Sequence, residues 1–169
     1  NCNKLISMAK GDYVAIYHSD DIYDLKIVEK EVEVLEANID LLGVFTIYEK
    51  IGEHGEIIKN SKYPIISDEE VIKVNLDEYI NIILEKGGSC FCCPTSMIKK
   101  DIYNKLNGYD VDLKYIEDQD MWGRILLNGS IGIINQKLLK YRIHSKQGSS
   151  IYFDNQRTDR ALPLNHINT

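Results

Sequence analysis

Residues 13–24 read YVAIYHSDDIYD, and this stretch decides the fold. Its first five residues are apolar or aromatic strand formers, a pattern typical of a strand buried on both faces of a parallel sheet. The run ends abruptly in His18, Ser19, Asp20 and Asp21. Ligands of open α/β sheets bind just outside the carboxyl ends of the strands, so two adjacent carboxylates stand where a ligand is expected.

The pair Asp20 and Asp21 has two interpretations. Adjacent carboxylates repel each other unless a cation lies between them, and Mg²⁺ or Mn²⁺ takes oxygen ligands and also bridges phosphate oxygens. The pair then predicts a metal-bound phosphorylated ligand. Alternatively, the two aspartates only cap a helix that starts near Asp24, where an acidic residue is favourable for that reason alone. Spacing leaves both interpretations open.

Helical patterns flank this strand on both sides. Residues 4–9 predict the end of a helix that Gly11 stops. After the acidic turn, apolar residues recur at steps of three and four and predict a buried helical stripe: Leu25, Val28, Val32, Leu35 and Ile39. Helix, strand, acidic turn and helix are a piece of α/β architecture.

The rest of the chain continues the alternation. We predict strands at residues 41–48, 90–98 (interrupted by Pro94), 130–134 and 138–143, a hairpin at 51–58, and a surface loop at 59–70. Helices are predicted around Leu76–Leu84 (closed by Gly87), at 99–106, and at 117–127 with Met121, Trp122, Ile125 and Leu126 facing inward. We expect one domain over residues 1–145 and a polar tail or linker over 146–169.

A second acidic cluster opens the predicted helix at residue 117. Glu117, Asp118 and Asp120 lie in its first turn, where the helix dipole alone favours acidic residues. The preceding stretch, NGYDVDLKY at residues 107–115, predicts a mobile loop that shapes a pocket. A carboxylate at such a junction can accept a proton from a sugar hydroxyl as that hydroxyl attacks, and the helix dipole keeps the carboxylate ionised.

A third candidate follows the last strand, in YRIHSKQGS at residues 141–149. Arg142 lies on the strand, and His144 lies where the regular structure stops. A lone histidine is more often structural than a ligand. His144 becomes a candidate ligand if the sheet brings it near Asp21.

Composition excludes several function classes. The 169 residues are 44% apolar and 27% charged, as in an ordinary globular protein. A balance of 26 acidic to 20 basic residues gives a net charge of −6, which argues against a nucleic-acid partner. No apolar run approaches the roughly 20 residues of a transmembrane helix. Of the four cysteines, Cys90, Cys92 and Cys93 lack zinc-site spacing and are expected to be buried in a reduced protein.

Five segments, taken in order, resemble family 2 glycosyltransferases, which are inverting enzymes with the GT-A fold. They are NKLISMAKGDYVA (3–15), HSDD (18–21), PTSMIKKDIYNKLNGYDVDL (94–113), EDQDMWGRILLNG (117–129) and LLKYRIHSKQGS (138–149). The resemblance covers residues 3–144. It implies a mixed, Rossmann-like GT-A sheet flanked by helices.

The resemblance also implies roles for individual residues. Asp20 contacts the ribose or diphosphate of a nucleotide-diphosphate sugar, foremost a UDP-sugar, and Asp21 holds the Mn²⁺ or Mg²⁺ that binds the diphosphate. Asp118 is the base that deprotonates the acceptor hydroxyl, and Glu117 positions the acceptor or Asp118 itself. His144 supplies a further metal or diphosphate contact.

Two further residues complete the implied site. His18 occupies the place where the family usually carries the first aspartate of its acidic motif, so the donor preference is expected to differ. Arg142 is expected to bind the donor. The chain has no initiator Met, and we expect it to lack the first nucleotide-binding βα units of the family.

The acceptor implied by the resemblance is a glycan or a lipid-linked glycan of the bacterial surface. The implied location is the cytoplasm, with peripheral association at the inner face of the membrane left open. The main alternative is a fragment that binds a glycan or a protein without turnover. A nucleotidyltransferase with a similar acidic pair is a second alternative.

Overall fold

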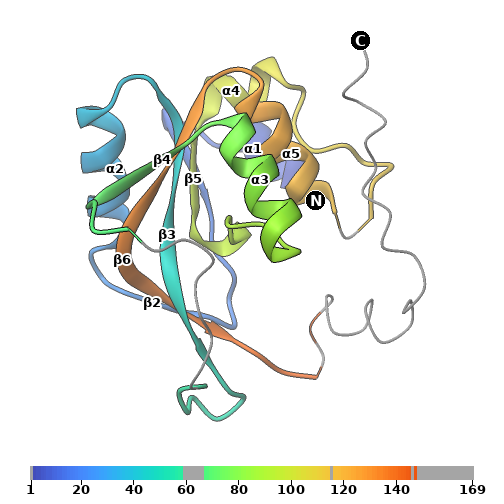
Figure 1. Ribbon diagram of the computed structural model, residues 1–169. Helices are drawn as coiled ribbons and strands as arrows, with labels where there is room; N and C mark the ends of the chain where they lie inside the picture. Colours follow the sequence, from blue (N-terminus) through green and yellow to red (C-terminus); the bar gives the residue numbers. More distant parts are fainter. Residues whose placement is uncertain (1, 59–66, 115, 146, 148–169) are drawn as a thin grey trace.

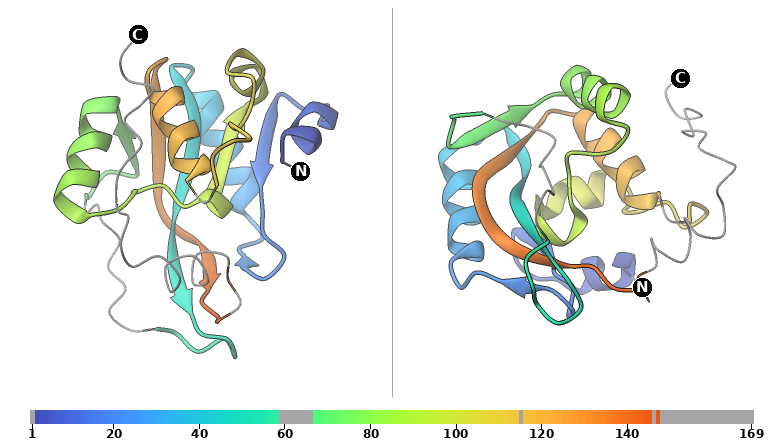
Figure 2. Two further views of the ribbon diagram at one scale, coloured as in Figure 1. Left: turned by 90° about the vertical axis from the view of Figure 1, so that its right-hand side faces the viewer. Right: turned by 60° about the horizontal axis from the view of Figure 1, so that its bottom comes forward.

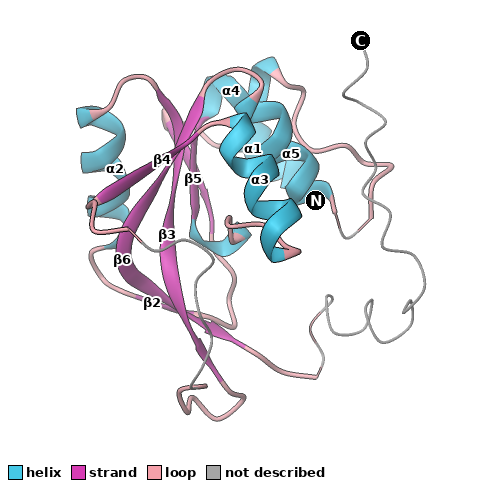
Figure 3. Ribbon diagram, in the orientation of Figure 1, coloured by secondary structure: helices cyan, strands magenta, loops and turns pink. Residues whose placement is uncertain are grey.

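The computed structural model describes residues 2–58, 67–114, 116–145 and 147. Within them, six strands form one mixed sheet with helices on both faces (Figures 1 and 3). The elements in chain order are α1 (Cys2–Met8), β1 (Tyr13–Ile16), β2 (Ile22–Tyr23), α2 (Ile27–Ala37), β3 (Leu41–Ile51), β4 (Val71–Val74), α3 (Leu76–Lys86), a 3₁₀ turn (Cys93–Thr95), β5 (Ser96–Lys99), α4 (Lys100–Lys105), α5 (Glu117–Leu126) and β6 (Ser130–Arg142).

The strand order is β1-β5-β3-β6-β2, with β4 pairing β6 off this path. β1 pairs antiparallel with β5, β5 pairs antiparallel with β3, and β3 runs parallel to β6. Two antiparallel pairings in succession restore the direction, so β1, β3 and β6 all point the same way. Their carboxyl ends therefore lie at one edge of the sheet.

The prediction that β1 is buried within a parallel sheet is wrong. Within the described residues, β1 pairs only with the antiparallel β5, and of its four residues only Val14 is buried. A short apolar run does not reveal the direction of its neighbours or how much of it is covered. The predicted position of the acidic turn at a carboxyl edge still holds, because β1 shares the direction of β3 and β6.

The two strands predicted at residues 130–134 and 138–143 are one 13-residue strand, β6, which runs from Ser130 to Arg142. The polar residues 135–137 that prompted the division coincide with a register shift. Thr46 of β3 pairs with Ile134, and the next residue, Ile47, pairs with Lys137. Asn135 leaves this ladder and binds the carbonyls of Ser67 and Glu69. The polar residues therefore mark a bulge within one strand.

The predicted stripe of α2 is only partly right, because Leu35 is buried and Val32 packs against the core but Val28 is exposed. Leu25 and Ile39 lie outside the helix and are 102% and 84% exposed, whereas the buried residues are Ile27, Glu31 and Leu35. The buried face is thus spaced by four residues, and its central position is a glutamate. A count of apolar residues alone could not select this face.

The strand predicted at residues 90–98 is reduced to β5, Ser96–Lys99. Pro94 lies in the 3₁₀ turn before it, and because proline has no N–H to donate, the ladder begins after that turn. The predictions for α3, α4 and α5 are confirmed. α3 ends at Gly87 with φ 71°, and Asn107 and Gly108 follow α4 with φ 58° and 70°. β4, within a few residues of the predicted surface loop, was not predicted.

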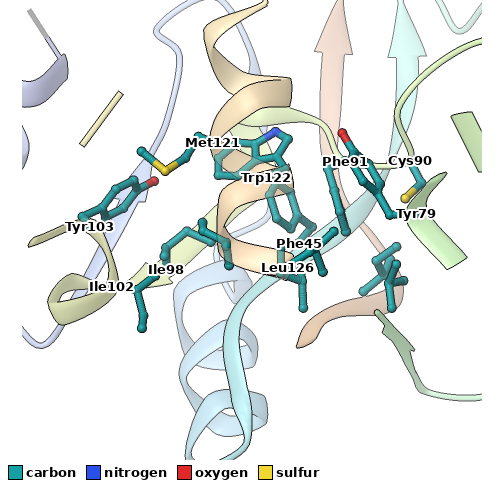
Figure 4. Close-up of a cluster of buried hydrophobic side chains, with 14 of the residues drawn as sticks. Phe45, Tyr79, Cys90, Phe91, Ile98, Ile102, Tyr103, Met121, Trp122 and Leu126 are labelled. Carbon is teal, nitrogen blue, oxygen red and sulfur yellow. The ribbon is translucent and has the colours of Figure 1, made fainter. Parts of the chain in front are cut away.

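The larger core lies on the face of the sheet that α3 and α5 cover, and Figure 4 shows part of it. Trp122 of α5 meets Phe45 of β3 edge-on, with ring centroids 4.9 Å apart, and Phe45 stacks on Phe91 at 4.6 Å. A smaller core around Leu35, Val44 and Met97 lies under α2 on the opposite face. α5, which carries the second acidic cluster at its first turn, is thereby fixed against the middle of the sheet.

Among the described residues, no helix combines the length and the apolar character needed to cross a membrane. The residues of the predicted tail, 146–169, lie outside the described part of the chain apart from Gln147.

Candidate active site

The carboxyl ends of β1, β3 and β6 bring three segments together (Figure 2, right). The acidic turn follows β1, a tight hairpin that begins at Gly52 follows β3, and residues 143–145 follow β6. The pairing of Ile51 with Arg142 is the last register pair between β3 and β6. It places Arg142 at the junction of all three segments.

Arg142 ties these segments together through backbone carbonyls. Its backbone N–H donates to Asp21 Oδ1 (2.8 Å), and its Nε donates to the Asp20 carbonyl (2.8 Å). Its Nη1 donates to the carbonyls of Gly52 (3.2 Å) and Glu53 (2.9 Å). The guanidinium therefore fixes the acidic turn against the hairpin. Direct binding of a donor by Arg142 stays a prediction.

The acidic turn collects three groups that could ligate a cation. One ligand atom each from His18, Asp20 and Asp21 lies within 4.8 Å of the others. His144 is not part of this group; its Nε2 lies 3.1 Å from Asp20 Oδ2. The sheet does bring His144 to the acidic turn, but to Asp20, and its role as a metal ligand stays a prediction.

The two aspartates of the turn differ in environment. The hydrogen bond from His144 is the main cause that lowers the pKa of the exposed Asp20. Burial raises the pKa of Asp21, against the opposing effect of the Arg142 N–H. Asp21 Oδ2 is buried and has no hydrogen-bond partner within the part of the chain that the structure describes. A buried carboxylate oxygen without a partner is costly, and a divalent cation bound between Asp21, Asp20 and His18 would remove that cost. The two carboxylates of this donor set suit Mn²⁺ or Mg²⁺, whereas an imidazole ligand is more usual for Zn²⁺, Cu²⁺, Fe²⁺ or Ni²⁺.

The second cluster lies at the start of α5. Asp118 Oδ1 accepts the Gln119 N–H at 2.7 Å, and burial raises the Asp118 pKa. The neighbouring Glu117 has a buried oxygen, Oε2, for which residues 2–58, 67–114, 116–145 and 147 provide no hydrogen-bond partner. Two carboxyl groups are therefore partly desolvated at one helix start, which is a common property of catalytic acids and bases.

The two clusters share neighbours. Burial is the main cause that raises the pKa of the Cys92 thiol, and the charges of Cys93, Asp21 and Asp118 raise this pKa further. Burial likewise raises the pKa of Asp118, against a small opposing effect of His18. Electrostatic effects of this kind weaken with distance, so these shared effects favour a position of the acidic turn close to the start of α5. The juxtaposition of Asp21 with Asp118 across one cleft stays a prediction.

The loop after α4, predicted to be mobile, is fixed in its first half. Asn3 of α1 exchanges two hydrogen bonds with the backbone of Tyr109, at 2.7 and 2.8 Å. Arg124 of α5 donates to the carbonyls of Leu106 (2.9 Å) and Gly108 (3.0 Å) and pairs with Asp120 at 2.7 Å. Glycine and aspartate composition indicated flexibility, but it could not show these long-range anchors.

A hollow lies beside this anchored loop, lined by residues 106–110 together with Asp120 and Arg124. It contains none of the residues predicted for donor, metal or base.

Sequence reasoning missed three residues that interact with the acidic turn directly or through a neighbour. Tyr23 accepts the His18 N–H at 2.7 Å, Glu31 accepts a hydrogen bond from Tyr17, and the pKa of the Cys92 thiol is raised chiefly by burial and in part by Asp21. Tyr17 was interpreted as a strand former, and neither Tyr23 nor Glu31 was singled out. A glutamate four residues from Ile27 and from Leu35 was the available signal for Glu31.

Comparison with solved structures identifies the fold. Staphylococcus aureus TarS, residues 1–349, solved with UDP-GlcNAc, superposes with a TM-score of 0.63 over 88% of this chain and 39% of TarS, at 16% identity. The class is therefore the GT-A fold. The sequence model of glycosyl transferase family 2 matches residues 1–106. The chain belongs to glycosyl transferase family 2.

Curated relatives of this chain are also named as glycosyltransferases. MJ1057, an uncharacterised glycosyltransferase of Methanocaldococcus jannaschii, is 33% identical over 145 residues, which are 85% of this chain and 46% of the relative. The O-antigen biosynthesis glycosyltransferase WbnJ of Escherichia coli is 33% identical over 149 residues, 85% of this chain and 52% of WbnJ. The chain spans about half the length of these relatives.

Proposed function

We propose that this chain is the catalytic and acceptor-side part of an inverting, metal-dependent glycosyltransferase that uses a nucleotide-diphosphate sugar. The observation that carries the proposal is the cluster of His18, Asp20 and Asp21 at the carboxyl end of β1, in which Asp21 Oδ2 is buried and has no hydrogen-bond partner among the described residues. A donor held at Asp21 would present its sugar to a base at Asp118.

The acidic turn is proposed to bind the donor. Asp21, with Asp20 and His18, would hold a Mn²⁺ or Mg²⁺ ion, and such an ion supplies stabilisation of the negative charge on the leaving diphosphate. The unpartnered Asp21 Oδ2 supports this role. Asp20 would contact the ribose or diphosphate, with Arg142 and His144 holding the turn in place or contacting the diphosphate themselves.

Asp118 is proposed as the base. It would take the proton from the acceptor hydroxyl while the hydroxyl oxygen bonds to the anomeric carbon. The bond from that carbon to the diphosphate oxygen breaks with its electron pair leaving on the diphosphate, and attack from the opposite face inverts the anomeric configuration. Glu117 would position the acceptor beside Asp118.

The substrates follow from the relatives by analogy. TarS was solved with UDP-GlcNAc and WbnJ is named for O-antigen biosynthesis, so we propose a UDP-sugar donor and a glycan or lipid-linked acceptor of the bacterial surface. We place the reaction in the cytoplasm and leave open whether the protein also associates with the inner face of the membrane.

The test is sugar transfer or donor hydrolysis by the protein that carries this chain, with Mn²⁺ and with a chelator. We expect turnover to require the ion, and Asp21→Asn and Asp118→Asn each to lower kcat by about 100-fold or more, in line with the contribution of a general base. Glu85→Gln, an exposed acid on α3, is the control and keeps full turnover.

Two results would contradict the proposal. Unchanged turnover in both aspartate variants would show that neither carboxylate takes part. Thermal stabilisation by Mn²⁺ and UDP without turnover for any nucleotide sugar would favour the alternative, a fragment that only binds.

A further inference from the structure

Glu31 is buried in the middle of α2, away from both carboxylate clusters. Its side chain is 0% exposed, and its Oε1 has no hydrogen-bond partner among the described residues. Burying a carboxyl group costs free energy that an apolar side chain of similar size would not. A contact that offsets this cost must therefore be sought at its other oxygen.

That oxygen binds a tyrosine next to the acidic turn. The Tyr17 hydroxyl donates to Glu31 Oε2 at 2.6 Å. Tyr17 is the last residue before His18, so the bond reaches from α2 to the chain segment that opens the candidate metal cluster. Burial raises the pKa of Glu31 to about 8, against the opposing effect of the Tyr17 hydroxyl. At neutral pH the carboxyl group is thus largely uncharged.

A second tyrosine continues the connection. The rings of Tyr17 and Tyr23 lie 4.5 Å apart between centroids, and Tyr23 Oη accepts the His18 N–H at 2.7 Å. Tyr23 is itself fixed, because it belongs to β2 and pairs with Leu139 of β6. The backbone of His18 is held through a stack whose two ends are α2 and the sheet.

We infer that Glu31 is a positioning residue for the acidic turn: through Tyr17 and Tyr23 it fixes the backbone of His18 and, with it, the geometry of His18, Asp20 and Asp21. The inference rests on the proposed function for its consequence in catalysis. Its structural part is independent of that function. Glu31 is not among the residues proposed to bind the donor or the cation, and its effect is transmitted by two hydrogen bonds and one ring contact.

The first measurement is hydrogen exchange of the His18 amide. It reports on the hydrogen bond between His18 and Tyr23 and needs neither substrate nor metal. Glu31→Leu keeps the volume and removes the acceptor, and Tyr17→Phe removes the donor. We expect both to speed His18 exchange by about tenfold or more, because the Tyr17 ring loses its anchor. Glu31→Gln keeps an acceptor oxygen and should restore slow exchange.

The matched control is Leu35→Ala. Leu35 lies one turn further along the same buried face of α2, 1% exposed, and has no part in the tyrosine stack. This variant loosens the helix without touching Tyr17, so slow exchange at His18 should persist. Unchanged exchange in Glu31→Leu, or equally fast exchange in Leu35→Ala, would overturn the inference.

The second measurement links the inference to catalysis. With Mn²⁺ saturating, Glu31→Leu should raise the donor KM about five- to tenfold and change kcat less than twofold, and Glu31→Gln should return the KM toward that of the parent. A fall in kcat alone would contradict positioning of the donor. Failure of the proposed function shows instead as intact turnover in Asp21→Asn and leaves the exchange result standing.

Discussion

Three carboxyl groups, those of Asp21, Glu31 and Asp118, have their pKa shifted in the same direction by the same main cause. Burial raises each of them, and in each case a hydrogen bond to the carboxyl group opposes the shift. Asp20, exposed and bonded to His144, is lowered instead. At the scale of single residues, burial therefore separates these three carboxyl groups, whose pKa is raised, from Asp20, whose pKa is lowered.

The raised pKa of Glu31 predicts how stability depends on pH. The folded state keeps the proton up to about pH 8, whereas an unfolded glutamate loses it near 4.5. The free energy of unfolding contributed by this group is therefore highest below pH 4.5 and falls by up to about 1.4 kcal/mol per pH unit as pH rises toward 8. Glu31→Gln should remove this slope.

The measurement is chemical denaturation of both proteins at several pH values between 4 and 9. Glu31→Gln is expected to gain stability over the parent as pH rises. Two parallel curves across this range would contradict a proton held by Glu31 in the folded state.

The raised pKa of Asp118 predicts the acidic side of the pH–rate profile. A base must be ionised, so kcat/KM should rise with pH through the pKa of Asp118, and burial places that rise above the usual aspartate value of about 3.9. The profile is measured with Mn²⁺ saturating, so that the metal cluster does not titrate. Activity independent of pH down to 4 would argue against Asp118 as the base.

At the scale of elements, Arg124 joins α5 to the loop after α4. Its side chain is 22% exposed, that of Asp120 only 11%, and its other donors satisfy two backbone carbonyls. Arg124→Met keeps the aliphatic contacts and removes these bonds. We expect a loss of about 2–3 kcal/mol in the free energy of unfolding, because hydrogen bonds to charged groups at partly buried sites are lost together.

Lys30→Met is the matched control, since Lys30 pairs with Glu33 on the exposed side of α2 with side chains 34% and 54% exposed. Such a surface pair is screened by solvent, so Lys30→Met should lower the free energy of unfolding far less than Arg124→Met does. Hydrogen exchange at Gly108 and Tyr109 should accelerate only in Arg124→Met. Equal losses of stability in the two variants would show that the anchor is no stronger than a surface pair.

The elements also show what the sequence could predict. α5 was predicted correctly because Met121, Trp122, Ile125 and Leu126 are apolar and all four are buried. The buried face of α2 was predicted only in part. One of its buried positions is Glu31, and a search for periodic apolar residues passes over a glutamate. The strand count failed at residues 135–137, because a bulge and a break between strands have the same polar pattern.

The candidate site divides in the same way. The acidic residues at the ends of β1 and at the start of α5 were found because strand ends and helix starts are legible in the sequence. The partners that orient them were not, because the contacts of Tyr23 with His18 and of Arg142 with Gly52 depend on register and on strand order. The positions of the candidate site residues could be predicted from the sequence. The residues that hold them in place could be identified only from the fold.

At the scale of the whole molecule, three strands of common direction deliver the acidic turn, the β3 hairpin and the end of β6 to one edge, and Arg142 binds all three. If its charge were what the donor needs, lysine would serve in its place. Arg142→Lys keeps the charge but cannot donate to the carbonyls of Asp20, Gly52 and Glu53 at once. We expect Lys and Met at this position to weaken binding of Mn²⁺ with UDP by a similar factor, about tenfold, measured by calorimetry. Full affinity in Arg142→Lys and loss in Arg142→Met would instead assign Arg142 a direct electrostatic contact with the diphosphate, since only the charge distinguishes the two variants in that comparison.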